Sequence, residues 1–543
     1  MSRILILGGY GGFGARLARR LAGQGHHILV AGRSAAKARA FCAGLDGAEP
    51  VVADRDGALA PVLAEHRPDL LIDAAGPFQR SGFHVPRACI RAGVAYLDLA
   101  DARDFVTGIG ALDAAARAAG TVVIAGASSV PALSGAVARR LAAGLDRVTQ
   151  VELAISASNR ATAGPSVAAA ILSYVGQPVR LWRHRGWTQG RGWQALRRER
   201  FAVAGAPALH GRWVALADVP DLDLLPAMLP GLPAVTFRAG TEIALQTLGL
   251  WLLSWPIRWF GLGSAARLAP LLLPLQRLTR PLTSDRSAMS VRLAGETKAG
   301  LVERCWTLIA DRGDGPEIPT LAAALLAAEI LAGRVPPGAR DAGRLLDLAQ
   351  FEPLFAALAV RHETIETALA PPLYARVMGP AFAALPPAVR AIHTVCRDGG
   401  ASGEARVVRG AGMLARLVAW VMRFPPAGTH PLHVSFTERG GTETWTRHFG
   451  PHRFSSRLSA KGGRLVERFG PLRFHFDLPS DEAGLGMAMR RWTCLGLPLP
   501  RALAPRSAAR EWQEGSRFRF DVPIALPLIG LVVQYDGWLA PVP

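Results

Sequence analysis

The chain has 543 residues, which at roughly 100–200 residues per domain predicts two to four domains. Half of the residues are hydrophobic and only 19% are charged, so large cores can form and wholesale disorder is excluded. The five cysteines form no C-x-x-C pair, which predicts a reducing compartment, no disulfide framework and no metal site.

The formal net charge is +20, and only three of the 62 basic residues are lysines. Such a charge favours nucleic acid, anionic lipid or an anionic substrate as a partner. A compositional bias that replaces lysine with arginine on solvated faces explains it equally well. An apolar strand starts at Ile4 with no charged leader before it, which predicts a cytoplasmic protein without a signal peptide.

A glycine-rich loop follows that first strand and precedes a helical pattern. Its motif is G-x-G-x-x-G, in which the glycines permit a tight turn, close approach of a pyrophosphate and close packing of helix on strand. The free N–H groups of the helix N-terminus then face the phosphates. The predicted cofactor-binding residues of the loop are Gly9, Tyr10, Gly11, Gly12, Phe13 and Gly14.

Further strands alternate with helices at regular spacing up to residue 148. They are predicted at residues 27–31, 50–53, 70–74, 95–99 and 121–125. Alternation of this kind predicts an α/β Rossmann domain, a doubly wound parallel sheet over residues 1–148 that binds a dinucleotide.

The end of the second strand favours NADP(H) over NAD(H). An acidic residue there usually binds the ribose 2′-hydroxyl, but this chain has Arg33 followed by Ser34, which suit a 2′-phosphate. A solvated surface arginine is the alternative. Asp54 is predicted near the adenine, and the small residues at the end of the fourth strand let the cofactor approach the backbone: Ala75, Gly76 and Pro77.

Candidate catalytic residues lie where parallel strands end, because ligands of doubly wound sheets bind at the carboxyl edge. Tyr96 is a candidate proton donor, and Asp98 and Asp101 either face the reaction or only cap and position loops. The predicted substrate-binding residues are Arg103, Ser128 and Ser129, of which Arg103 suits a carboxylate or phosphate and the serines the nicotinamide end. No tyrosine is followed four residues later by lysine, so the Tyr-x-x-x-Lys pair of short-chain dehydrogenases is absent.

Residues 149–360 are predicted to form an α+β substrate or dimerisation-type domain with an antiparallel sheet. Within it, residues 243–257 carry no charge, but the stretch is shorter than the ~20 residues that a membrane span needs. Tryptophans at 251, 255 and 259 share one helical face, so the apolar helices of 243–276 are either a buried pair or a surface that lies on an anionic membrane. The basic and aromatic cluster of residues 180–200 is better explained as a hairpin than as a nucleic-acid site.

Residues 366–543 are predicted to form a mainly antiparallel β domain. Apolar residues alternate along its strands, so one face of the sheet is buried. A curved sheet with a helix near residues 484–492 would enclose either an apolar ligand or a solid core.

The first ~360 residues resemble the saccharopine dehydrogenase-like NADP-binding family. The resemblance rests on the glycine loop, on residues 31–34, 75–78 and 96–99, and on Ala125-Gly126 ahead of Pro131. It implies a Rossmann fold and NADP, and it leaves the substrate open. The last ~170 residues resemble the bacterial domain of unknown function 4166, through residues 445–450, 467–470, 496–500, 520–522 and 535–539.

The sequence therefore predicts an NADP(H)-dependent oxidoreductase that transfers hydride to or from a hydrophobic, membrane-derived substrate. The alternative is a non-catalytic NADP(H) sensor or scaffold whose C-terminal domain binds lipid. The expected location is the cytoplasm, including the inner face of the membrane, and the oligomeric state stays open.

Overall fold

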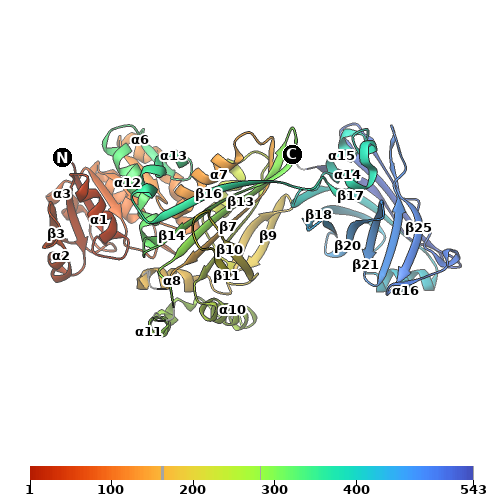
Figure 1. The fold of residues 1–543 in the computed structure, drawn as a ribbon, viewed down its shortest axis with the longest axis horizontal. Coiled ribbons are helices and arrows are strands. Elements are labelled where there is room, and N and C mark those ends of the chain that lie inside the picture. Colours follow the sequence, from red (N-terminus) through yellow and green to blue (C-terminus); the bar gives the residue numbers. More distant parts are fainter. Residues whose placement is uncertain (160–163, 280, 282, 542–543) are drawn as a thin grey trace.

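The computed structural model describes residues 1–159, 164–279, 281 and 283–541. Three parts follow one another along the long axis of the molecule, as Figure 1 shows. The first two share one hydrophobic core, which runs from Ile4 in the first sheet to Trp306 in the second. The third has a core of its own around Phe449 and Trp445.

The first domain is a seven-stranded parallel sheet with the order β15-β6-β5-β4-β1-β2-β3. The strands from its own sequence region are β1 (Arg3–Leu7), β2 (His27–Gly32), β3 (Ala48–Val52), β4 (Leu70–Asp73), β5 (Ala95–Asp98) and β6 (Val122–Ala125). Its helices are α1 (Gly14–Gly23), α2 (Ala35–Cys42), α3 (Ala60–His66), α4 (His84–Ala92), α5 (Arg103–Gly108), α6 (Asp113–Ala118) and α7 (Ser134–Ala142). Separate apolar clusters lie on the two faces of this sheet, which confirms the predicted doubly wound fold.

The seventh strand comes from far along the chain. β15 (Gly338–Asp341) pairs in parallel with β6, and α12 (Ile318–Leu331) packs against α1. Arg20 of α1 and Glu317, just before α12, form an ion pair of 3.0 Å. Residues that the sequence pattern assigned to the middle domain therefore complete the first sheet.

The middle part is a seven-stranded mixed sheet with the order β10-β11-β12-β7-β13-β14-β16. Its strands are β7 (Arg147–Ala157), β10 (Arg197–Phe201), β11 (Leu209–Leu216), β12 (Ala234–Thr241), β13 (Ser287–Thr297), β14 (Gly300–Ala310) and β16 (Val360–Ala368). The neighbouring pairs are antiparallel as predicted, except that β12 runs parallel to β7. The basic cluster forms the expected hairpin, β8 (Pro178–Arg183) with β9 (Gly186–Arg191).

Three apolar helices lie at one edge of the middle sheet: α8 (Pro165–Ser173), α10 (Ala244–Trp259) and α11 (Ala269–Leu278). α10 buries Ile257 but leaves large side chains in solvent, including Leu252, Trp259 and Phe260. The three tryptophans contact one another in series along α10, with ring centroids 6.1 and 5.4 Å apart. Among the described residues, no helix is long and apolar enough to cross a membrane.

The C-terminal part is a strongly curved sheet of 13 strands, in the order β23-β24-β27-β28-β29-β17-β18-β19-β20-β21-β22-β25-β26. The long ones are β17 (Asp398–Arg409), β18 (Gly428–Arg439), β19 (Thr442–Phe449), β20 (His452–Lys461), β21 (Arg464–Phe469), β22 (Leu472–Asp477), β25 (Ala488–Cys494), β27 (Arg510–Glu514), β28 (Arg517–Leu526) and β29 (Gly530–Pro541). The short ones are β23 (Ser480–Asp481), β24 (Gly484–Gly486) and β26 (Leu497–Pro498), and the helices are α14 (Leu373–Met378), α15 (Pro387–His393) and α16 (Met413–Val421).

The helix expected at residues 484–492 is wrong, because this stretch forms β24 and β25. Its apolar residues pair with neighbouring strands, as Phe474 does with Trp492, so sheet pairing overrides local helix propensity. The C-terminal sheet is held to the middle sheet by ion pairs, including Asp398 to His184 at 2.9 Å and Arg397 to Glu303 at 3.0 Å.

A substitution at Gly135 tests the packing of α7 beneath the seventh strand. A Cβ at this position would collide with the backbone carbonyl of Gly343, which cannot rotate away. We expect Gly135→Ala to cost about 1–3 kcal/mol, the usual range for overpacking, and to lower the thermal midpoint by about 2–4 °C per kcal/mol. Circular dichroism measures this shift. The control is Gly23→Ala in α1, where a Cβ meets nothing within 4 Å, and an equal loss in both variants would contradict the packing argument.

Candidate cofactor groove and substrate cleft

The glycine loop has the backbone contacts that a pyrophosphate site needs. A Cβ at Gly14 would collide with the carbonyl oxygen of Gly8, and one at Gly9 would lie 2.9 Å from the carbonyl oxygen of Ile6. Gly11 and Gly12 are exposed, and their backbone leads into α1. In the part of the chain that the structure describes, no side chain caps the start of this helix with a hydrogen bond. The predicted roles of the glycines in turning and in close packing therefore match this loop.

The end of β2 is built around Tyr10. Its ring lies where a Cβ of Gly32 would be, and its hydroxyl accepts a hydrogen bond of 3.0 Å from the backbone N–H of Ser34. Ser34 caps α2 by accepting from the N–H of Lys37 at 3.4 Å. The side chain of Arg33 is exposed, and among the described residues it has no ion pair. The side chains of Arg33, Ser34 and Lys37 thus all belong to the start of α2. Two cations and a hydroxyl are donors that suit a ribose 2′-phosphate.

The other predicted cofactor residues lie along the same edge. Asp54 is exposed after β3, and Ala75, Gly76 and Pro77 follow β4 as a partly exposed small-residue turn. Under this turn, Asp73 accepts from the N–H of Ala75 at 3.0 Å and from Nε of Arg55 at 2.7 Å. Burial raises the pKa of Asp73 in spite of the nearby Arg55, so this buried pair is a costly structural support for the cofactor edge.

Tyr96 and Asp98 are fully buried in this structure. Oδ1 of Asp98 accepts backbone N–H bonds from Gly126 at 2.7 Å and Ala100 at 2.9 Å, so it ties the end of β5 to the end of β6. Burial raises the pKa of Asp98 to about 7 and the pKa of Tyr96 well above its ordinary value. The Tyr96 hydroxyl is buried, and the nearby carboxylates of Asp98 and Asp73 add to the effect of burial on its pKa.

Helix α8 has its two ends near two parts of the predicted cofactor site. At its start, the backbone nitrogen of Gly164 lies 3.9 Å from the position of a Cβ on Gly12. At its end, Tyr174 is close enough to Asp101 for that carboxylate to raise its pKa, after the larger effect of burial. One helix therefore spans from the pyrophosphate loop to the carboxyl edge of β5.

Asp101 is the predicted catalytic residue whose side chain is exposed at the end of β5. It is exposed to solvent and accepts a hydrogen bond of 3.2 Å from Nε2 of Gln79, which follows the small-residue turn. Protein surrounds the carboxyl on most sides, and this partial desolvation raises its pKa. Asp101 and Tyr174 thus bring a carboxyl and a phenol to one place.

Arg103 is engaged by other residues, although a role in substrate binding was predicted. It donates to both oxygens of Asp223, at 2.6 and 2.5 Å, to Asp218 at 3.0 Å and to the carbonyl of Arg180 at 2.7 Å. Its side chain is only 5% exposed, and its guanidinium donors are used in these contacts, which link the two domains. The guanidinium is therefore not free to bind a ligand. Ser128 is buried and Ser129 half-buried in the turn before α7.

Sequence reasoning missed Tyr174, Gln79 and the Arg103 partners, because each comes from a segment that reaches this site only through tertiary packing. The one available signal for Tyr174 was its position at the end of a predicted helix next to a buried apolar run. Among the described residues, no group of three or more metal-ligating side chains is found.

The fold and the glycine loop define the first domain as a Rossmann-type dinucleotide-binding domain. Residues 4–124 match the family model described as the saccharopine dehydrogenase NADP binding domain. Residues 385–539 match the domain of unknown function DUF4166. The chain is thus a fusion of these two domains, as the sequence motifs predicted.

Other comparisons add little. No curated protein matches the chain. An amine dehydrogenase from Mycobacterium smegmatis is 14% identical, with 64% of this chain and 96% of that one covered and a TM-score of 0.39. An actinorhodin polyketide ketoreductase with NADPH is 20% identical over 23% of this chain and 68% of that one, with a TM-score of 0.20. Similarities this weak carry no argument about substrate.

The pH dependence of stability tests the raised pKa of the buried Asp98 carboxyl. Its folded-state pKa of about 7 lies above the ordinary value of 3.8, so its stabilising contribution is full below pH 3.8 and is lost as the pH rises through about 7. Asp98→Asn keeps the acceptor for Gly126 and Ala100 and removes the titration. We expect the variant to gain on the order of 1–3 kcal/mol over the wild type between pH 5 and pH 8.

Urea unfolding at the two pH values measures this gain. A variant that loses stability relative to the wild type as the pH rises would show that the ionised carboxylate is the form the fold requires. Asp104→Asn, at an exposed position of α5, is the control that should leave the pH dependence unchanged.

Proposed function

We propose that the protein is an NADP(H)-dependent oxidoreductase that transfers hydride to or from a hydrophobic substrate. The observation that carries this proposal is the position of α8, which begins beside Gly12 of the glycine loop and ends at Tyr174, near the carboxylate of Asp101. When bound, the nicotinamide cofactor would supply the hydride. The loop residues fit it, since the glycines leave room for the pyrophosphate and Arg33 is exposed.

Selection for NADP(H) is proposed to rest on the start of α2. Arg33 and Lys37 supply positive charge, and Ser34 supplies a hydroxyl beside backbone N–H groups. A 2′-phosphate would receive charge-assisted hydrogen bonds there, whereas a bare ribose would leave the arginine without a partner.

Tyr174 is proposed as the proton donor at the nicotinamide end. The phenol of Tyr174 is protonated at neutral pH, and burial and the neighbouring carboxylates of Asp101 and Asp218 raise its pKa further, so it would donate only to a strongly basic oxygen. A protonated phenol can donate to an alkoxide that forms on the substrate, and Asp101 can position it or return the proton. This role replaces the one first predicted for Tyr96.

A hydrophobic substrate is proposed because the walls around Tyr174 are apolar. Leu172, Val175 and Trp193 are buried beside it, and they continue into Ile257 of α10. The outer face of α10 and α11 exposes further large apolar side chains: Leu245, Leu252, Trp259, Phe260, Leu262 and Leu271. An exposed patch of this kind suits peripheral contact with a membrane, from which such a substrate would come.

The second candidate is a non-catalytic NADP(H) sensor with a lipid-binding C-terminal domain. It is favoured by the full engagement of Arg103 and the burial of Tyr96, which leave few free polar groups at the carboxyl edge. The open carboxyl of Asp101 favours the enzyme. Hydride transfer in a single turnover separates the two.

Arg33→Ala tests the cofactor assignment. Loss of charged hydrogen bonds to a phosphate should raise the Kd for NADPH about ten- to a hundredfold and leave the Kd for NADH unchanged. Titration of tryptophan fluorescence measures both. Arg39→Ala, an exposed arginine further along α2, is the matched control, and an unaltered preference in Arg33→Ala would overturn the assignment.

Tyr174→Phe tests the proposed proton donor. We expect kcat to fall about a hundredfold or more, the usual effect of losing a general acid, with the Kd for NADPH changed less than about twofold. Stopped-flow oxidation of NADPH with long-chain aldehydes and ketones measures the rate. Tyr10→Phe should do the opposite, weakening cofactor binding with little change in kcat, and equal rates for Tyr174→Phe and the wild type would exclude Tyr174 as the donor.

A further inference from the structure

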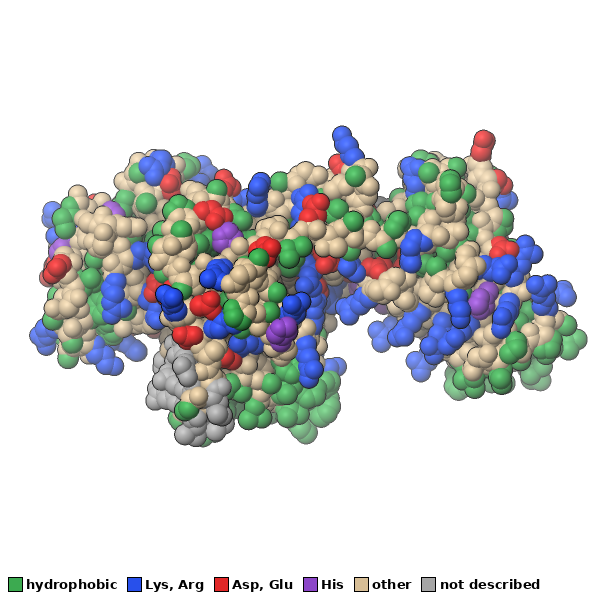
Figure 2. Space-filling model, in the orientation of Figure 1, with side chains coloured by type: hydrophobic (Ala, Val, Ile, Leu, Met, Phe, Trp, Pro, Cys, Tyr) green, Lys and Arg blue, Asp and Glu red, His purple; other side chains and the backbone are tan. Residues whose placement is uncertain are grey.

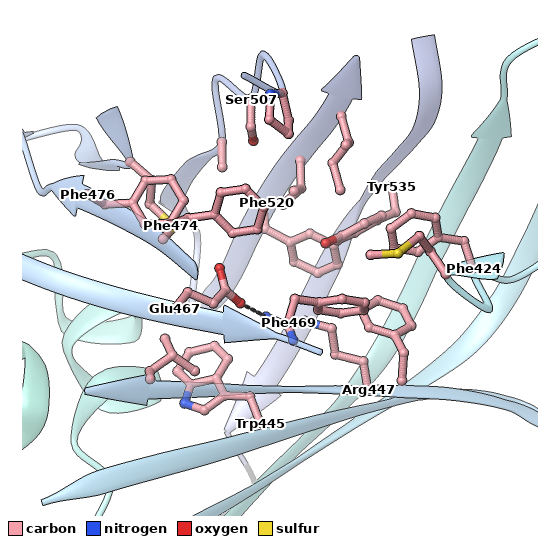
Figure 3. A pocket seen from close by; sticks show the side chains of 18 of the residues that line it. Phe424, Trp445, Arg447, Glu467, Phe469, Phe474, Phe476, Ser507, Phe520 and Tyr535 are labelled. Carbon is pink, nitrogen blue, oxygen red and sulfur yellow. Dashed lines mark ion pairs between the residues drawn. The ribbon is translucent and has the colours of Figure 1, made fainter. Parts of the chain in front are cut away.

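The curved C-terminal sheet encloses a cavity of about 220 Å³. Its walls are mostly aromatic and aliphatic, with Phe424, Phe469, Phe474 and Phe520 among them (Figure 3). For scale, an apolar cavity of about 150 Å³ stays dry and takes a benzene-sized molecule. This cavity has room for a larger apolar group, and its apolar lining favours one over water.

A few charged groups interrupt the apolar wall, and they occur in pairs. Arg447 lies 3.8 Å from Glu467, as the dashed line in Figure 3 marks, and donates to Ser456 at 3.0 Å. Glu511 is paired with His393 at 2.6 Å. The guanidinium offers hydrogen-bond donors and the carboxylate acceptors without net charge, so the site suits a hydroxyl or carbonyl group better than an anion.

The register of the hairpins places four turns at the same end of this sheet as α16. Phe449 pairs with His452, Phe469 with Leu472, and Leu526 with Gly530, while Leu472 also pairs with Cys494. α16 connects β17 to β18 at this end and packs on β29. We call α16 and the turns at 449–452, 469–472, 494–497 and 526–530 the α16 end.

Large apolar side chains stand in solvent at the α16 end. On the helix, the exposed fractions of Met413 and Trp420 are 85% and 76%, and Leu528 in the last turn is fully exposed. The remaining exposed members are Leu414, Leu417, Val421, Leu495, Leu497 and Leu503. Figure 2 shows this end as a hydrophobic surface at the lower edge of the C-terminal domain.

The charges near these side chains are of one sign. The stretches 410–428, 449–453, 468–473, 491–510 and 522–535, which build this end, contain no aspartate or glutamate, and all but the last contain arginines. Asp481, Glu482 and Glu514 lie in exposed turns at the opposite end of the sheet. An apolar tip with a basic surround matches a membrane with anionic headgroups.

α16 is apolar on both of its faces. Its inner face contributes Val418 to the cavity wall, Met422 follows from the turn after it, and its outer face carries Leu417 and Trp420. A helix that is apolar all round is normally buried on both sides, but here solvent covers one of them. A bilayer would cover that face and would place its acyl chains one helix away from the cavity.

A membrane fits this surface better than a folded protein does. The apolar patch of α10 lies along the same long edge of the molecule as the α16 end (Figure 2), although the two come from different domains. One flat, extended, anionic surface would contact both patches at once. It would also attract a protein with a net charge of +20.

We propose that the α16 end of the C-terminal domain docks on an anionic membrane and that the cavity behind it binds one hydrophobic chain with an uncharged hydroxyl or carbonyl head. The chain lies among the phenylalanines, and its head meets Arg447 and Glu467. This assigns a ligand site to the DUF4166 domain and does not depend on whether the first domain is catalytic.

Co-sedimentation of the full chain with vesicles tests the docking. Phosphatidylcholine vesicles with about one third phosphatidylglycerol should bind the protein at low salt and release part of it at high salt. The double variant Leu417→Asp/Trp420→Asp should lose binding about tenfold or more, because one buried Leu side chain already corresponds to that factor. Lys461→Asp, at the opposite end, makes the same change in net charge and should bind like the wild type.

Other variants make the result decisive. The double variant Leu495→Asp/Leu528→Asp changes two other turns of the α16 end and should also lose vesicle binding. Both double variants should keep the NADPH binding and the thermal midpoint of the wild type. Trp259→Asp/Phe260→Asp measures the α10 patch separately. The proposal would be overturned if the wild type bound vesicles no better than Leu417→Asp/Trp420→Asp. It would also be overturned if the wild type formed a dimer that this variant dissociates, since a second copy would then cover the surface.

The cavity is tested by the lipid that stays bound. After incubation with the same vesicles containing decanol or decanoate, the protein is re-isolated and its lipid measured by mass spectrometry. We expect about one decanol per chain, less decanoate, and loss of both from Leu458→Trp, which fills the cavity but still sediments with vesicles. No retained lipid, or preference for the acid, would overturn the ligand assignment.

Discussion

The contact on which the candidate site depends is the buried clamp of Arg103. This one guanidinium, at the start of α5, holds the carboxylates of Asp218 and Asp223 and the backbone of the β8–β9 hairpin. It holds the middle domain against the carboxyl edge of the first sheet. Removing one member of a buried pair typically costs about 3–5 kcal/mol, because the partner charge is left without compensation.

The clamp also explains the division of labour at the carboxyl edge of the first sheet. Arg103 and Asp98 serve the architecture, the first between domains and the second between strand ends. Asp101, two residues before the clamp, is left exposed. Neighbouring residues of one short segment thus differ in role according to the direction of each side chain.

The sequence predicted those parts of the protein that local chemistry dictates. The glycine loop, Arg33 at the end of β2 and the strand–helix alternation of the first domain depend on backbone geometry within a few residues, and the structure contains them. β15 could not be predicted in the first sheet, because its pairing with β6 joins residues more than 200 positions apart. The same limit applies to Tyr174, which reaches Asp101 only once α8 has packed.

Burial and strand pairing are the features that the local patterns left open. Tyr96 was predicted to be catalytic from its place near a strand end, and in the structure its side chain is fully buried. The stretch 484–492 looked helical by itself and became β24 and β25 through pairing with β22 and β27. In both cases tertiary packing decided what the local pattern left open.

α8 links the glycine loop to the outer surface of the molecule. The helix begins beside Gly12 and ends at Tyr174, and it packs on α11 and on the apolar cluster that includes Ile257 of α10. The same α10 exposes Trp259 to solvent. Under the proposed function, this one helix therefore connects the cofactor loop with the apolar surface that is proposed to contact a membrane.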